Sequence, residues 1–410
     1  MIYGTVHPDF LPLRTALEKQ IARHPGGAAI SVYHHGEKVV DLWGGVRNED
    51  GDPWTQDTMS VSFSTTKGAA STAIHMLVDR GLLSYDDPVV KHWPEFGQQG
   101  KENILVRHVL SHQAGLYDVR SMIESPRELL DWEHMIHLFE QARPKHAPGK
   151  HTAYHGITYG YLTGELVRRV TGIPFTRFVE EEMAQPLGLD GFHVGVPRER
   201  LGRVAKLIKA PKKKQQEQQA RKGKVTQRRG SIPTRMFWSL VRGGMRVAGL
   251  HADLTETKAA LLPRQIGSFD FAADEVVQAC IPAANGVFTA RSLARFYACL
   301  ANGGELDGVR LLSPKTLEAA TAMQIRRADL VLLFRMHWRL GYHGVTTPRG
   351  VSKHAFGHFG YGGSGAWAHP KHNLSFAMTV NSGQGTPMGD LRIVRMSGVA
   401  LRCAQRRRVT

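Results

Sequence analysis

The chain has little cysteine and no long apolar run. Its 410 residues include three cysteines, Cys280, Cys299 and Cys403, and no C-x-x-C pair, so neither a disulfide framework nor a zinc site is expected. No apolar stretch reaches the roughly 18 residues that a membrane-spanning helix needs. Residues 1–20 contain no basic segment followed by an apolar one, which argues against a signal peptide. We therefore expect a cytoplasmic protein.

Three common catalytic motifs are also absent from the sequence. There is no phosphate-binding G-x-x-x-x-G-K-[ST] loop and no zinc-binding H-E-x-x-H pair. The run Gly362-Gly363-Ser364-Gly365 is followed by Ala366, so it is not the G-x-S-x-G element of an α/β-hydrolase. Because these motifs are absent, the sequence gives no reason to predict a metal or an organic cofactor.

The positive charge is concentrated in one segment. The chain has 53 basic and 36 acidic residues, a formal charge of +17, and residues 203–229 hold eleven basic residues and one acid, a local excess of 11 − 1 = 10. The rest of the chain is close to balance, so no nucleic-acid partner is expected. The polar composition near 203–230 predicts a basic loop. Because apolar residues follow at 235–250, three interpretations of the 203–250 region stay open: a solvated loop before a core segment, contact with an anionic membrane surface, or a lid over an apolar pocket.

Hydrophobic periodicity predicts regular structure near both ends of the chain. Apolar residues recur at helical spacing within 10–23, and the β-rich runs on either side of His35-Gly36 indicate a hairpin. The other predicted elements there are a helix at about 65–82, strands at 364–370 and 374–381, and a last helix at about 388–404.

This order of elements predicts an α/β fold whose sheet is built from both ends of the chain. The sheet is expected to be antiparallel, because the alternating βα units of a doubly wound parallel sheet are absent. We predict one α/β sheet domain from residues 1–72 and 283–410. A mostly helical domain is predicted for residues 73–282, which include the basic loop.

A serine and a lysine share one face of the helix that is predicted to start near residue 65. Ser64 and Lys67 are one helical turn apart in the run Ser64-Thr65-Thr66-Lys67, so the amine lies near the hydroxyl. A serine hydroxyl is a weak nucleophile that needs such a base, and a helix N-terminus favours developing negative charge. An ordinary serine N-cap at the start of a surface helix explains the same motif.

The wider sequence resembles a known family of enzymes. The segments FSTTKG, DRGLLSYDDPV and LSHQAGL occur in this order between residues 63 and 116, and APGKHTAYHG and GHFGYGGSG follow at 147–156 and 357–365. This pattern resembles the serine β-lactamase-like hydrolases, which include class C β-lactamases, penicillin-binding carboxypeptidases and the family VIII carboxylesterases. The resemblance extends over roughly residues 8–400 and is greatest to the esterase branch. It implies the β-lactamase-like (transpeptidase-like) fold.

The resemblance implies roles for three side chains. Ser64 matches the nucleophile of the family, Lys67 the partner that helps to deprotonate it, and Tyr154 the tyrosine that moves protons between the serine and the leaving group. A tyrosine can do this only beside a cation that favours its phenolate, or by relay through the lysine. A packed loop aromatic is the other interpretation of Tyr154.

The same resemblance implies a substrate-binding and oxyanion element near the C-terminus. His358-Phe359-Gly360 matches the position where lactamases carry Lys-Thr-Gly and esterases often carry His-x-Gly. His358 is then expected to polarise the pocket or to steer the leaving group, and a hydrogen-bonded histidine at a strand edge is the alternative. The backbone N–H groups of Ser64 and Tyr361 are expected to form the oxyanion hole, and Gly360 suits a close approach of backbone to ligand.

Two departures from the lactamase pattern bear on the substrate. Gly156 stands where lactamases have the Asn of Tyr-x-Asn, and His358 replaces a fixed cation that would face a substrate carboxylate. We therefore predict a serine hydrolase that cleaves small, neutral carboxylic esters through an acyl-enzyme on Ser64. The alternatives are a D-amino acid peptidase or weak β-lactamase, acyl transfer to an alcohol, and a catalytically silent binding protein of the same fold.

Overall fold

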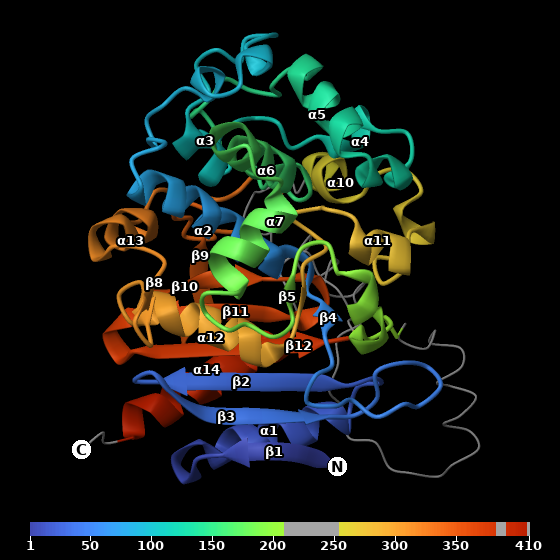
Figure 1. Ribbon diagram of the computed structural model, residues 1–410, viewed down its shortest axis with the longest axis vertical. Coiled ribbons are helices and arrows are strands. Elements are labelled where there is room, and N and C mark those ends of the chain that lie inside the picture. The colour runs from blue at the N-terminus through green and yellow to red at the C-terminus, as the bar shows by residue number, and fades with distance from the viewer. Residues whose placement is uncertain (209–253, 383–390, 408–410) are drawn as a thin grey trace, which may run out of the picture.

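A seven-stranded antiparallel sheet forms most of the lower half of the computed structural model, which describes residues 1–208, 254–382 and 391–407 (Figure 1). The spatial order of its strands is β1-β3-β2-β12-β11-β10-β9. In chain order, their bounds are β1 Ile2–Val6, β2 Ala28–His34, β3 Glu37–Gly44, β9 His343–Thr347, β10 Gly350–Phe359, β11 Gly365–His369 and β12 Leu374–Val380. The pairing of β2 with β12 joins the two ends of the chain, which confirms the predicted sheet.

The predicted hairpin forms between β2 and β3. His35 and Gly36 connect the two strands, and both have positive φ, at 53° and 79°. Two left-handed residues in a row are typical of the tight turns whose twist matches that of the paired strands. The local sequence thus sets the turn that pairs β2 with β3.

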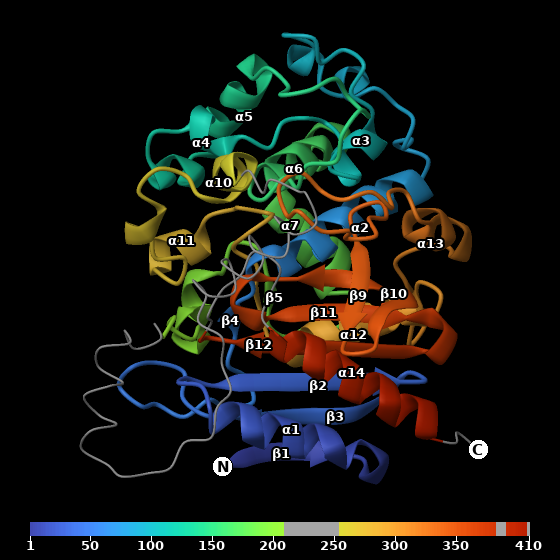
Figure 2. The same cartoon turned by 180° about the vertical axis from the view of Figure 1, so that it is seen from behind.

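Two helices cover one face of the sheet. α1 (Leu11–Ile21) and α14 (Leu391–Arg406) lie side by side on this face, in front of the strands in Figure 2. α1 buries Leu13 and Leu17, and α14 buries Ile393 and Met396, in one cluster with the side chains of the sheet. Helix α14 therefore confirms the last helix that the sequence predicted.

The opposite face of the sheet carries α12 (Ala290–Ala301) and α2 (Thr66–Asp79). The side chains of α2 are buried from Thr66 to Leu77, because this helix also contacts α6 of the helical region. Side chains at the N-terminus of α2 therefore lie between the sheet and the helical region.

The remaining helices form the upper part of the molecule in Figure 1. They are α3 Val106–Leu110, α4 Val119–Met122, α5 Trp132–Gln141, α6 Thr158–Thr171, α7 Phe175–Val179, α10 Thr255–Leu261, α11 Asp274–Gln278 and α13 Pro314–Thr321. Short strands β4 Ser60–Val61, β6 Val287–Phe288 and β5 Phe192–His193 form a second sheet, and β7 Glu305–Leu306 pairs with β8 Val309–Arg310.

The division into two domains stays a prediction, and α2 crosses its proposed boundary at residues 72 and 73. Most of the basic loop and all of 235–250 fall outside the described residues, so the surface and lid interpretations stay open. Two cations at its beginning form ion pairs, Arg203 with Asp190 at 2.8 Å and Lys206 with Asp274 at 2.7 Å. Among the helices that the structure describes, none combines the length and apolar character needed to cross a bilayer.

Candidate active site

Ser64 lies in a tight turn between β4 and α2. The turn is a single 3-10 helix, Phe63–Thr65, and Phe63 adopts a positive φ of 46°. Left-handed backbone at a phenylalanine is strained and persists where the surroundings fix it, as is common next to reactive groups. The hydroxyl of Thr66 donates to Phe63 O at 2.5 Å and accepts from Gly286 N at 2.9 Å, which holds the turn in place.

Helix α2 is a buried helix, so the interpretation of Ser64 as the N-cap of a surface helix is wrong. The residue before α2 is Thr65, and its side chain makes no capping hydrogen bond. Ser64 itself is partly exposed. Its hydroxyl faces Lys67 and Tyr154.

Lys67 brings a buried amine to this hydroxyl. Its Nζ lies 3.1 Å from Ser64 Oγ and donates to the carbonyl oxygens of Gly156 at 2.6 Å and Ala283 at 3.0 Å. Burial lowers the pKa of Lys67 well below its usual value. A neutral amine has two N–H donors and one lone pair. Because the two carbonyls take the donors, the lone pair is left to face Ser64 Oγ.

Tyr154 reaches the same oxygen from the other side. Its hydroxyl donates to Ser64 Oγ at 2.7 Å, although 90 residues separate the two in the chain. Burial raises the pKa of Tyr154, and the bond to Ser64 only partly opposes this, so the side chain is a neutral phenol. Lys67 Nζ lies 4.9 Å from the centre of its ring. The phenol is a proton donor here, and the packed-aromatic interpretation leaves its contact with Ser64 unexplained.

His358 lies at the end of β10, with its imidazole close to Tyr154. Its Nδ1 lies 3.0 Å from Phe359 O, which can only accept, so Nδ1 carries the proton and Nε2 carries a lone pair. Nε2 has no hydrogen-bond partner among the described residues. Burial, and then the proximity of His343 and Lys67, lower the pKa of His358 well below its usual value. The imidazole is therefore a neutral hydrogen-bond acceptor.

The chain after His358 passes close to the nucleophile. A Cβ on Gly360 would lie 2.1 Å from Ser62 O, so only glycine allows this approach. The ring of Tyr361 packs edge-on against Phe63, with 5.4 Å between the ring centres. Tyr361 is thus beside the turn that carries Ser64, and its side chain is about half exposed.

A small cavity lies between Tyr154 and the end of β10. It has a volume of about 10 Å³ and is lined by Tyr154, Leu332, Met336, Trp338, His343, His358 and Phe359. This is close to the space that one water molecule needs. Burial lowers the pKa of His343 to about 4, so both lining imidazoles are neutral. The cavity therefore offers an uncharged, largely aromatic wall.

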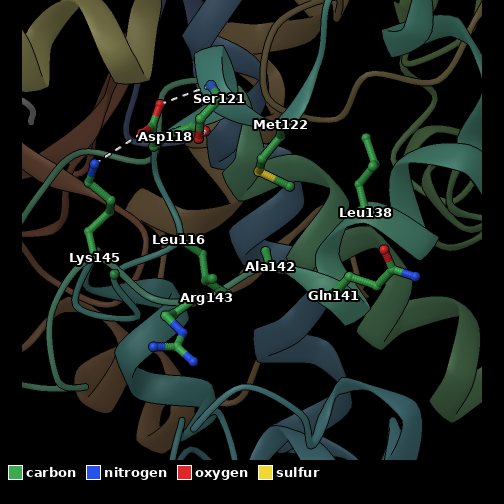
Figure 3. A pocket seen from close by; sticks show the side chains of 10 residues that line it. Leu116, Asp118, Ser121, Met122, Leu138, Gln141, Ala142, Arg143 and Lys145 are labelled. Atoms are coloured by element: carbon green, nitrogen blue, oxygen red, sulfur yellow. Dashed lines mark hydrogen bonds and ion pairs between the residues drawn. The ribbon is translucent and has the colours of Figure 1, made fainter.

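A larger hollow of about 240 Å³ lies elsewhere, beside α4 and α5 (Figure 3). Lys145 and Asp118 pair across its rim at 3.2 Å, and the backbone N–H of Ser121 donates to the same carboxylate. None of the predicted site residues lines it. In the described part of the chain, no group of three or more His, Cys, Asp or Glu side chains could hold a metal ion.

Sequence reasoning missed Asp329, Trp338 and His343. Asp329 accepts from the backbone N–H of Tyr154 across 175 residues of chain, and Trp338 stacks on the ring of Tyr154. His343 Nε2 accepts from Phe359 N at 2.9 Å. No motif or spacing marks these residues, because their roles depend on chain segments that meet only in the folded molecule.

Comparisons with known proteins are consistent with this geometry. A family model described as "Beta-lactamase" matches residues 13–400. "Esterase/beta-lactamase LipL" of Mycobacterium tuberculosis is 37% identical over 93% of this chain and 83% of its own length. A solved penicillin-binding protein homologue from Caulobacter crescentus is 34% identical, with a TM-score of 0.83, over 98% of this chain and 100% of its own. A family VIII carboxylesterase structure is 30% identical, with a TM-score of 0.80, at the same coverage.

Proposed function

We propose that this chain, which belongs to the beta-lactamase family and is a serine hydrolase, cleaves carboxylic esters through an acyl-enzyme on Ser64. One observation carries the proposal. Oγ of Ser64 lies within hydrogen-bonding distance of a buried amine, that of Lys67, and of a buried phenol, that of Tyr154. This arrangement supplies a base for the nucleophile and a separate acid for the leaving group.

Acylation begins with the proton of the serine hydroxyl. Lys67 takes this proton while Oγ of Ser64 bonds to the ester carbonyl carbon and the carbonyl electrons move onto oxygen. The backbone N–H groups of Ser64 and Tyr361 are the proposed donors to this oxyanion, supported by the packing of Tyr361 beside Phe63. Removing one such donor typically costs about 2.7–4 kcal/mol of transition-state stabilisation.

Collapse of the intermediate breaks the bond to the alcohol. The leaving oxygen takes the hydroxyl proton of Tyr154, and the ammonium of Lys67 returns a proton to the tyrosine oxygen. Because burial disfavours the phenolate of Tyr154, relay through the lysine fits better than a stable phenolate base. Water then attacks the acyl-enzyme, and the same groups carry the protons in the reverse order.

Several features support a neutral substrate. His358 offers a lone pair where a lysine would offer a cation, so the pocket suits a hydrogen-bond donor or an apolar group better than a carboxylate. A Cβ at Gly156 would lie 2.4 Å from Leu261 and 2.7 Å from Ala260 O, so α10 fills the space of a longer side chain there. These features favour esters over β-lactams and over D-amino acid peptides that end in a carboxylate.

The proposal is tested with a fluorophosphonate probe and short p-nitrophenyl esters. The wild type is expected to be labelled and to hydrolyse the esters, and Ser64→Ala to do neither. Ser364→Ala is the matched control, because Ser364 is a buried serine whose Oγ accepts from Val380 N at 3.2 Å, and labelling is expected to persist. Labelling that survives Ser64→Ala would contradict the assignment.

Other substrates separate the alternatives. Turnover of nitrocefin or release of D-alanine at a higher kcat/KM than ester hydrolysis would favour a lactamase or peptidase. Absence of any burst with activated esters would favour a catalytically silent binding protein. A new ester product in the presence of added alcohols would show acyl transfer.

A further inference from the structure

The carboxylate of Asp329 is buried and accepts four N–H groups. Oδ1 accepts from the backbone N–H of Tyr154 at 3.1 Å, Val331 at 2.9 Å and Leu332 at 3.0 Å. Oδ2 accepts from the indole of Trp338 at 3.1 Å. No cation pairs with this carboxylate in the described part of the chain. Two of its four donors thus belong to aromatic residues at the active site.

Trp338 continues this contact to the ring of the catalytic tyrosine. The indole stacks on Tyr154 with 5.6 Å between ring centres and 10° between planes. The ring of His112 packs edge-on against both aromatic rings, with its centre 4.3 Å from that of Trp338 and 5.0 Å from that of Tyr154. Asp329 therefore contacts the backbone of Tyr154 directly and its phenol ring through Trp338.

The segment that follows Asp329 is fastened to the same region. Leu330 N donates to Thr152 O at 2.9 Å, and the hydroxyl of Thr257 in α10 donates to Val331 O at 2.5 Å. Leu332, Met336 and Trp338 of this segment line the small cavity beside Tyr154. The carboxylate thus joins the tyrosine to a wall of the small cavity beside it.

We propose that Asp329 is a positioning residue that aims the hydroxyl of Tyr154 at Ser64 by fixing both the tyrosine backbone and the stacked indole of Trp338. The inference rests on the proposed function, in which Tyr154 gives a proton to the leaving group. An apolar residue would fill the same volume without holding either contact. Burial without a cation raises the pKa of Asp329 to about 6, a cost that a purely structural position could avoid.

Asp329→Asn tests this with little change of shape. The amide oxygen still accepts the three backbone N–H groups, but its NH2 group then faces the indole N–H of Trp338, and two donors cannot bond to each other. With sites counted by fluorophosphonate titration, we expect kcat to fall roughly tenfold or more, because small misplacements of reacting groups are costly. KM is expected to stay within about twofold, since Asp329 does not touch the substrate.

The leaving group provides a readout that altered stability alone does not move. An alkoxide needs a proton to leave, whereas p-nitrophenolate does not. Asp329→Asn is therefore expected to lose more kcat/KM, which reports the acylation step, on an ethyl ester than on the matching p-nitrophenyl ester. If this variant yields no titratable sites, Trp338→Phe carries the test, since it keeps a ring against Tyr154 and removes the indole N–H that Asp329 accepts.

A double-mutant cycle and a remote control complete the experiment. Because Asp329 and Trp338 act through one contact, the double variant is expected to lose less than the product of the two single losses. Asp79→Asn is the control. Asp79 accepts from Ser313 N at 3.1 Å and lies at the far end of α2, about 20 Å from its start at 1.5 Å per residue. It is expected to lower stability and leave kcat unchanged.

Two results would overturn the inference. One is Asp329→Asn with wild-type kcat and kcat/KM on both esters, and the other is a set of single losses that simply multiply in the double variant. A wild type that no fluorophosphonate labels would instead contradict the proposed function, so the two failures are distinguishable.

Discussion

The substitution Tyr154→Phe isolates one oxygen atom at the active site. The phenylalanine ring keeps the stacking on Trp338, and only the hydroxyl that donates to Ser64 Oγ at 2.7 Å is lost. The free energy of unfolding is expected to fall by about 0.5–1.5 kcal/mol, the usual net value of one hydrogen bond. A loss of transition-state stabilisation larger than this value then reflects the chemical step and not altered folding.

The expected magnitude follows from the role of Tyr154 as an acid. Proton transfer from a positioned side chain contributes about 10²–10⁴-fold to a rate. At 1.36 kcal/mol for each factor of ten, this is about 2.7–5.4 kcal/mol of transition-state stabilisation. We expect kcat/KM for an ethyl ester to fall by that factor. For the matching p-nitrophenyl ester the loss is expected to be at least tenfold smaller, because its leaving group needs no proton.

The assay compares kcat/KM of the two esters for the wild type, Tyr154→Phe and a control. Tyr159→Phe is a matched control, because Tyr159 is a fully buried tyrosine whose hydroxyl bonds to Ser71 at 2.6 Å and does not reach Ser64. It should cost similar stability and treat both esters alike. Equal losses on the two esters in Tyr154→Phe would refute the reasoning that the phenol protonates the leaving alcohol.

Two further outcomes are expected. Lys67 must be neutral to act as the base, and burial lowers its pKa. We therefore expect kcat/KM to fall as the pH drops below the pKa of Lys67, at an inflection well below the value of about 10.4 for a free lysine. Lys67→Arg should be inactive throughout a profile from about pH 5 to 10, because arginine stays charged. A wild-type inflection at the free-lysine value would contradict the lowered pKa of Lys67. Gly360→Ala places a Cβ 2.1 Å from Ser62 O and should lower the free energy of unfolding by about 1–3 kcal/mol and slow fluorophosphonate labelling. Gly267→Ala, which meets open space, is its control in urea denaturation, and equal stability of the two variants would exclude the steric argument.

Much of the fold could be predicted because its signals are local. The period of apolar residues in α1 and α14, and the turn at His35-Gly36, depend on neighbours a few residues apart. The order of elements then predicted an antiparallel sheet from both ends of the chain, and the pairing of β2 with β12 confirms it. The helical region was predicted only in outline, because Gly and Pro breaks interrupt its periodicity.

The amino-acid sequence by itself determined the chemistry that is available at the site. It specified a serine and a lysine one helical turn apart, the resemblance that pointed to Tyr154, and a histidine and a glycine in place of the lysine and asparagine of the lactamases. Helical spacing alone brings Lys67 near Ser64, so this pair needed no tertiary information.

Only the tertiary structure decided how these groups are protonated and aimed. Burial turns Lys67 toward a neutral amine and Tyr154 toward a neutral phenol, and burial depends on segments that are distant in the chain. Asp329 meets Tyr154 across 175 residues, and no local pattern records such a contact. Desolvation and long-range hydrogen bonds are properties of the packed molecule. The sequence could therefore predict which atoms react, but not their protonation or orientation.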